Sequence, residues 1–329
     1  MNLAKYIIIF SLSVNPVFGQ IERTLSSDEK HFYEKLITVF REKSIEKEKI
    51  DWTDFEKKVL EKALIDRDSA IILALDLNGN PHTFYKYQGG YLYQSNRIVR
   101  SDTTLKKKCN FIDFKTELPG IGYIEIPGLI TDPSNPEATK IRAQKYINEI
   151  VDSIKSIDQK ELKSWIIDLR NNSGGNMWPM LIALTPFYPN GTLGYFISDK
   201  KEASWSKSIG QIWIDESSQT NKYLSDPIFY KLKNKKLKIA VLIGPQTGSS
   251  GEAVAISTKS IKASKLFGTK TAGFSTANLP IKIIEGEYLI LTTSVDADFN
   301  KKKYWDGISP DINCNCEEII TELSKWLAE

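Results

Sequence analysis

Two adjacent serines stand where an apolar run of the chain gives way to a helix-like run. The stretch KIAVLIGPQTGSSGEAVA places Ser249 and Ser250 at this junction. The first N–H groups of a helix lack intrahelical partners, and the helix dipole favours negative charge at that end. A serine held there could attack a carbonyl carbon, because the resulting oxyanion would meet N–H donors. Taken alone, such a stretch is more often an ordinary helix N-cap.

A second loop has the composition that would complement such a serine. The stretch WIIDLRNNSGGN places Gly174 and Gly175 between an apolar strand and the next helix. Without a side chain, glycine lets backbone N–H groups approach a ligand closely. The N–H of Ser250 and that of Gly174 or Gly175 would together form the oxyanion hole that acyl transfer requires. Asp168 and Arg170 are expected to hold this loop in shape, although the loop alone could equally be a turn or an anion-binding nest.

The ordered combination of motifs resembles the C-terminal-processing, or tail-specific, serine peptidases. The matching stretches are DW at 51–52, NGNPHT at 78–83, GYIEIP, WIIDLRNNSGG, GSSGE, FGTKTAG and GISPD at 307–311. In this family the nucleophilic serine lies three residues before a glutamate, so Glu252 identifies Ser249 as the matching serine. The resemblance implies a ClpP/crotonase-like α/β core that cleaves peptides or proteins near their C-terminus without metal or organic cofactor.

The sequence departs from that family in two ways. Most members use a lysine 25 residues after the serine, and this count reaches Phe274, which cannot accept a proton. Lys270 lies four residues earlier, on the other side of a glycine turn, and is a poor substitute. About 38 residues separate His82 from the first core strand. A PDZ domain needs roughly 80 to 90 residues, so none is expected here.

His82 is the best candidate for the missing base. A serine hydroxyl needs an adjacent base, and an imidazole titrates near neutral pH. Family members that lack the lysine, such as the nisin-resistance peptidases, and the tricorn-type peptidases place a histidine from the N-terminal region against the serine. His82 lies in the matching turn. Asp306 matches an acidic position that the tricorn-type enzymes use, and it would orient the imidazole.

Two other interpretations remain open at this point. The loss of the lysine favours a non-catalytic ligand- or peptide-binding protein on the same fold, since the retinoid-binding interphotoreceptor proteins share the core. The retention of Ser249, both glycine loops and a placed histidine argues against it. Alternatively, a shifted turn would let Lys270 serve as the base. In that case Lys270→Ala would abolish activity and His82→Ala would leave most of it.

The surrounding elements suggest two structural parts. Residues 20–100 are expected to form a helical N-terminal domain that bears the histidine turn, with capping boxes at Ser26–Glu29 and Thr53–Glu56. In residues 101–329, apolar strands alternate with helices, which is typical of an α/β core. The polar and aromatic segment 195–235 could be a lid or an insertion that faces the substrate.

The first 19 residues have the pattern of a signal peptide. Lys5 precedes the apolar run YIIIFSLSV, and small residues stand at the −3 and −1 positions of a cut before Gln20. The run is short for a membrane span of about 20 residues. We therefore expect an exported protein, periplasmic or extracellular, with no stable membrane span after cleavage. An uncleaved N-terminal anchor is the alternative.

The amino-acid composition limits the kinds of partner that we expect. The chain has 44 basic and 41 acidic residues without a long basic block, which argues against nucleic acid and leaves a peptide or protein as the expected substrate. Only two histidines occur, and Cys314-x-Cys316 is isolated, so no metal site is expected. Export permits a disulfide, in which Cys109 would pair with Cys314 or Cys316 and leave one thiol over.

Overall fold

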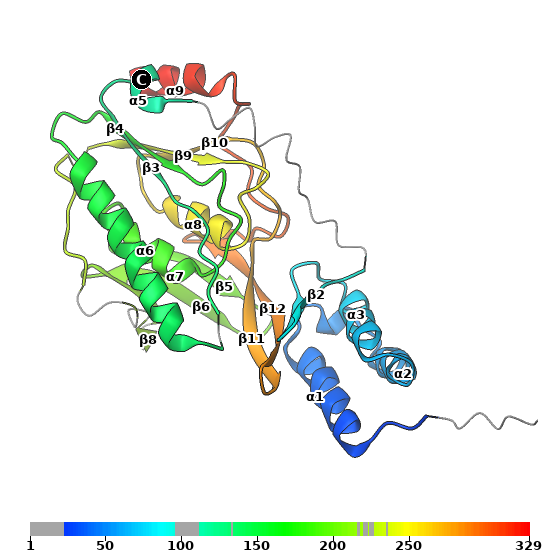
Figure 1. The fold of residues 1–329 in the computed structure, drawn as a ribbon. Helices are drawn as coiled ribbons and strands as arrows, with labels where there is room; N and C mark the ends of the chain where they lie inside the picture. The colour runs from blue at the N-terminus through cyan, green and yellow to red at the C-terminus, as the bar shows by residue number, and fades with distance from the viewer. Residues whose placement is uncertain are drawn as a thin grey trace, which may run out of the picture.

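The computed structural model describes most of the chain (Figure 1). The residues described are 23–95, 112–132, 134–215, 218–219, 223, 227–234 and 236–329. The expected signal peptide and Cys109 therefore lie outside the described residues. Within these ranges, no helix combines the length and the apolar character that crossing a bilayer requires.

The N-terminal part is helical, as the sequence predicts. It contains α1 (Ser27–Lys43), the 3-10 turn η1 (Lys47–Lys49), α2 (Trp52–Ala63) and α3 (Arg67–Asn78). The capping box of Ser26 and Glu29 is present at the start of α1. The predicted start of α2 is wrong, because Asp51 caps this helix by accepting hydrogen bonds from the N–H groups of Thr53 and Asp54. A carboxylate can accept both amides at once, which displaces the threonine from the cap position.

A five-stranded parallel sheet forms the centre of the larger part. Its strand order is β13 (Ile312–Asn313), β10 (Ser264–Gly268), β9 (Lys238–Ile243), β4 (Ser164–Asp168) and β3 (Ile121–Glu125). Both faces are covered, and alternate side chains enter different cores. Trp165 and Ile167 pack with α6 (Pro136–Ile157), α7 (Met177–Ala183) and α8 (Ser250–Thr258). Ile166 packs on the opposite face with α5 (Phe114–Glu117) and α9 (Ile319–Ala328).

An antiparallel sheet lies beside this core. Its path runs β2 (Gly90–Leu92), β1 (Phe84–Tyr87), β12 (Glu287–Asp298), β5 (Gly191–Ile197), β6 (Glu202–Ser208), β7 (Gln211–Ile214) and β8 (Ser218–Gln219), and β11 (Thr276–Ile284) pairs with β12. Strands β5 to β7 include the first half of segment 195–235 in this sheet, and whether this half faces the substrate stays a prediction. Trp205 in β6 is fully buried, and its indole N–H donates to the hydroxyl of Ser257.

Strand β12 joins the two parts of the molecule. One end pairs with β1 of the N-terminal part, where Phe84 lies opposite Ile290. The other end pairs with β5 of the core, where Val295 lies opposite Ile197. The hairpin of β11 and β12 reaches from the core toward α1 (Figure 1), and buried side chains of this hairpin pack in the same apolar cluster as α1 to α3. The histidine turn is therefore anchored to the core through β12.

The cysteines of the C-terminal region differ in state. Cys314 is a free thiol that is 2% exposed, and burial raises its pKa. Cys316 is disulfide-bonded. Of the two pairings that the sequence left open, the structure therefore rules out the one that uses Cys314.

Candidate active site

Ser249 stands at a sharp corner between β9 and α8. It is the N-cap residue of α8 and has φ 53° and ψ −119°. A positive φ is unusual for a residue with a side chain, and such strain is often found at functional sites. The neighbouring Ser250 is buried, and its hydroxyl donates to the carbonyl of Gly175 at 2.5 Å. The hydroxyl of Ser250 is thus committed to the glycine loop, and Ser249 is the serine at the corner.

The glycine loop after β4 packs directly on this corner. Gly174 and Gly175 have φ of +106° and +120°. A Cβ on Gly174 would lie 2.7 Å from the Cβ of Ser249. A Cβ on Gly175 would lie 2.2 Å from the carbonyl oxygen of Leu129. Both positions therefore require glycine, for the approach as well as for the backbone conformation.

The structure distinguishes the candidate donors for an oxyanion. The N–H of Gly174 donates to Oδ1 of Asn172 at 2.9 Å, so this N–H is already used. The N–H groups of Gly175 and Ser250 have no hydrogen-bond partner in the described parts of the chain. Of the two glycines that the sequence offered, Gly175 is the one whose N–H is available beside that of Ser250.

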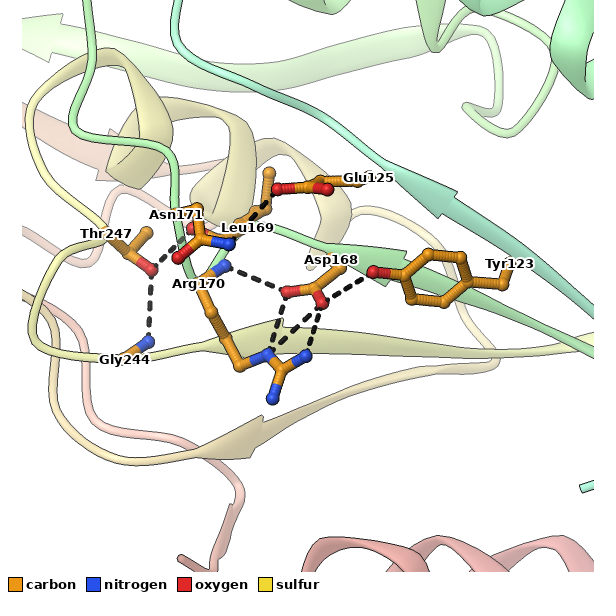
Figure 2. Close-up of polar contacts among 8 residues, drawn as sticks. All are labelled: Tyr123, Glu125, Asp168, Leu169, Arg170, Asn171, Gly244 and Thr247. Carbon is orange, nitrogen blue, oxygen red and sulfur yellow. Dashed lines mark hydrogen bonds and ion pairs between the residues drawn. The ribbon is translucent and has the colours of Figure 1, made fainter. Parts of the chain in front are cut away.

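Asp168 and Arg170 support the glycine loop as expected (Figure 2). The Asp168 carboxylate lies 2.6 Å from Nη2 of Arg170 and accepts a hydrogen bond from the hydroxyl of Tyr123 at 3.0 Å. Asp168 is 1% exposed, and the ion pair is largely shielded from water. The hydroxyl of Thr247 donates to the carbonyl of Leu169 at 2.8 Å. These contacts join the ends of β3, β4 and β9 behind the glycine loop.

Phe274, where most related peptidases would have lysine, lies against the serine corner. Its N–H donates to Oε2 of Glu252 at 2.8 Å, and the N–H of Ser249 donates to the same oxygen at 2.9 Å. A Cβ on Gly248 would lie 3.8 Å from the Phe274 ring. The position 25 residues after the serine is therefore adjacent to it in space, but an aromatic ring occupies the place of a base.

Lys270 is engaged elsewhere. Its Nζ lies 3.2 Å from Oδ2 of Asp306, and the two side chains are 53% and 84% exposed. Such an exposed pair is worth little energetically, and it directs the ammonium toward the surface carboxylate. The structure thus brings Lys270 and Asp306 together.

His82 is buried and lies against the Phe274 ring. It lies in the turn between α3 and β1, is 7% exposed, and donates its backbone N–H to Oδ1 of Asn80 at 3.0 Å. Its ring centroid is 5.2 Å from that of Phe274. Nδ1 lies 2.7 Å from Oγ1 of Thr276, whereas Asp306 had been expected to orient the ring. Phe274 therefore contacts both the imidazole and the serine corner, and Thr276 is a site residue that the sequence analysis missed.

Glu252 is a second residue whose role was missed. It is fully buried and accepts hydrogen bonds from the N–H groups of Ser249, Gly273 and Phe274 and from the hydroxyl of Thr271. Burial raises its pKa, and these hydrogen bonds act in the opposite direction. The carboxylate holds the serine corner and the turn before β11 in one arrangement. In the sequence, Glu252 served only as a landmark for the nucleophile.

Asp296 of β12 carries a second buried carboxyl group near Glu252. It is 2% exposed, and its Oδ1 has no hydrogen-bond partner in the described residues. Burial, and then the charge of Glu252, raise the pKa of Asp296 well above its ordinary value. Two ionised carboxylates in one dry region would repel each other, which favours the neutral form of Asp296, while Glu252 accepts the hydrogen bonds of the surrounding donors.

We expect Asp296→Asn to keep activity and to increase stability at neutral and alkaline pH. Below the unfolded pKa of about 3.8, Asp296 is neutral in both states. As pH rises, the unfolded chain loses this proton before the folded chain does, so the free energy of unfolding falls by up to about 1.4 kcal/mol per pH unit until the folded pKa is reached. Asparagine resembles the neutral acid and cannot ionise.

Urea unfolding of the wild type and Asp296→Asn between pH 4.5 and 8.5 measures this difference. The slope of the free energy of unfolding against pH should be less negative in the variant. The contribution of Glu252, whose pKa is also raised, should remain in both proteins. Equal slopes would show that Asp296 is ionised in the folded protein.

Comparisons with known proteins identify the family and the fold. The sequence matches the model of peptidase family S41 over residues 120–314. It is 28% identical to the nisin-resistance protein of Lactococcus lactis subsp. lactis over 272 residues, which are 80% of this chain and 77% of that protein. A lipoprotein from Streptococcus agalactiae has a similar structure, with TM-score 0.68, 20% identity and coverage of 93% and 98% of the two chains. The photosystem II D1 C-terminal processing protease gives TM-score 0.52, 13% identity and coverage of 92% and 97%.

Proposed function

The chain belongs to peptidase family S41 and is a serine-type peptidase, and we propose that it is exported and cleaves peptides or proteins near their C-terminus. Residues 1–19 are proposed as the signal peptide, 20–100 as the N-terminal domain and 101–329 as the peptidase core. Export is supported by the N-terminal pattern and by the similarity to a streptococcal lipoprotein. Cleavage near the C-terminus is supported by the fold shared with the D1 C-terminal processing protease.

The observation that carries the proposal is the serine corner itself. Ser249 has a strained backbone at a helix N-terminus, Gly174 packs against it, and the N–H groups of Ser250 and Gly175 make no hydrogen bond to the described part of the chain. A buried imidazole, His82, contacts the Phe274 ring, and this ring also packs on the serine corner. A nucleophile, a base and two donors for an oxyanion are the groups that acyl transfer needs.

The proposed reaction has two halves. Ser249 Oγ attacks the scissile carbonyl carbon as His82 takes its proton, and the oxyanion accepts hydrogen bonds from the N–H groups of Ser250 and Gly175. His82 then gives the proton to the leaving amine as the C–N bond breaks. In the second half His82 takes a proton from water, the hydroxide attacks the acyl ester, and Ser249 regains its proton.

Mass spectrometry of peptide digests tests the function. Protein beginning at Gln20 would be incubated with a peptide mixture and with the same peptides amidated at the C-terminus. We expect cuts near the C-terminus of the free-carboxyl peptides and a fluorophosphonate adduct on Ser249. Equal cleavage of the amidated peptides, or cuts spread along the substrate peptides, would contradict the C-terminal preference but not the peptidase activity. No cleavage and no adduct would contradict the assignment of Ser249.

A further inference from the structure

The backbone of His82 is held on both sides by side chains of neighbouring elements. Its N–H donates to Asn80 in the same turn. Its carbonyl accepts a hydrogen bond from Nδ2 of Asn278 in β11 at 2.8 Å. Oδ1 of Asn278 accepts in turn from the hydroxyl of Thr292 in β12 at 2.7 Å. The position of the residue is therefore fixed by the β11–β12 hairpin, and the remaining freedom is the rotation of the ring.

The ring is fixed by Thr276. Its Oγ1 lies 2.7 Å from Nδ1 of His82. Nδ1 carries either one hydrogen or one lone pair, so the contact with Thr276 uses the one hydrogen bond that Nδ1 can make. We propose that Thr276 is the positioning residue of the general base, and that its hydroxyl accepts the Nδ1–H so that the Nε2 lone pair receives the proton of Ser249. This inference rests on the proposed function, in which His82 is the base.

A bonded path connects Thr276 to the nucleophile. The N–H of Ser249 and the N–H of Phe274 donate to the same oxygen of Glu252. Thr276 follows Phe274 by two residues and begins β11, where it lies opposite Val295 of β12. A β-branched side chain in a strand has few χ1 rotamers, so the direction of the hydroxyl is restricted. The contacts of one carboxylate and one hydroxyl thus fix the base relative to the serine.

A hydroxyl partner differs from a carboxylate in charge. It holds the imidazole in one orientation, whereas a carboxylate there would also add a negative charge that stabilises the imidazolium. Asp296 of β12 is a buried carboxyl group near Glu252, and its Oδ1 has no hydrogen-bond partner in the described residues. The other nearby carboxylates have partners. Glu46, which accepts from Asn80, pairs with Lys49, and Asp306 pairs with Lys270. Glu252 is surrounded by the backbone amides that it accepts from.

Three substitutions of Thr276 test this role. We expect Thr276→Val to lower kcat about 10- to 100-fold with little change in KM, because a hydrogen bond to the base is lost while the substrate contacts remain. Thr276→Ser keeps the hydroxyl and should retain kcat within about threefold. Thr276→Asp should raise the pKa of the acid limb of kcat/KM by about one unit or more.

Thr192→Val is the matched control. Thr192 is a half-buried residue of β5, and its hydroxyl makes no hydrogen bond within the described part of the chain. Thermal melting would be recorded for each variant, and if Thr276→Val does not fold, the pH shift of Thr276→Asp decides. Wild-type kcat in Thr276→Val, or an unshifted acid limb in Thr276→Asp, overturns the inference. Full activity of His82→Ala would instead contradict the proposed function, on which the inference about Thr276 rests.

Discussion

Replacing Ser249 or His82 with alanine should abolish peptide cleavage, lowering kcat by a factor of about 10⁴ to 10⁶. Without Ser249 no acyl-enzyme forms, and without His82 the serine hydroxyl keeps its proton and the leaving amine receives none. The double variant should lose no more kcat than either single variant, because the two groups act as one unit. Steady-state cleavage of a substrate from the peptide mixture measures kcat and KM for each variant.

Matched controls come from the same chain. His31 is the other histidine and is exposed on α1, so His31→Ala should match the wild type. Ser156 is exposed on α6, and Ser156→Ala removes a serine hydroxyl outside the site. If His82→Ala stays active while Lys270→Ala is silent, the lysine is the base and the ion pair with Asp306 must open before it can act.

Gly175→Ala should lower kcat about 10²- to 10³-fold, as the loss of one oxyanion donor does in other acyl-transfer sites. The added Cβ would lie 2.2 Å from the carbonyl of Leu129, so the loop must move and the N–H of Gly175 moves with it. The affinity for substrate should change much less than kcat, because the oxyanion exists only in the transition state.

Gly191→Ala separates this effect from backbone strain. Gly191 has φ +118°, close to the +120° of Gly175, and a Cβ there would meet no atom within 4 Å. Both variants should lose stability because alanine is strained at positive φ. Only Gly175→Ala should also lose kcat. Equal kcat in the two variants would show that Gly175 does not supply the donor.

Much of the core was predictable because its strands carry two buried faces. Near-continuous apolar runs such as SWIIDL and KIAVLI can be satisfied only in a parallel sheet covered by helices. The antiparallel strands β5 to β7 were not predicted. Strands β6 and β7 each have a single buried residue, Trp205 and Ile212, and β6 also carries serine and lysine. So weak an apolar pattern is hard to separate from a loop.

The site was predictable where a residue type is itself informative. Three features of the sequence reduce the number of candidate site residues. They are the glycines at 174 and 175, the serine pair before Glu252 and the presence of only two histidines. The contact of Thr276 with His82 joins residues 194 positions apart and depends on the pairing of β11 with β12. A threonine at the start of a strand is too common to stand out. Asp306 was chosen from its position in a motif, but a motif does not determine which residue the side chain contacts. In the structure Asp306 pairs with Lys270.

The pairing of β1 with β12 also sets the order in which the enzyme can become active. Phe84 lies opposite Ile290, so one edge of the strand that follows the histidine pairs with a partner segment about 200 residues later in the chain. During synthesis, the amino-terminal half emerges long before that partner does. An incomplete chain therefore lacks the strand that pairs with β1 next to the histidine turn, and the proposed Ser–His activity would begin only after β12 has been made.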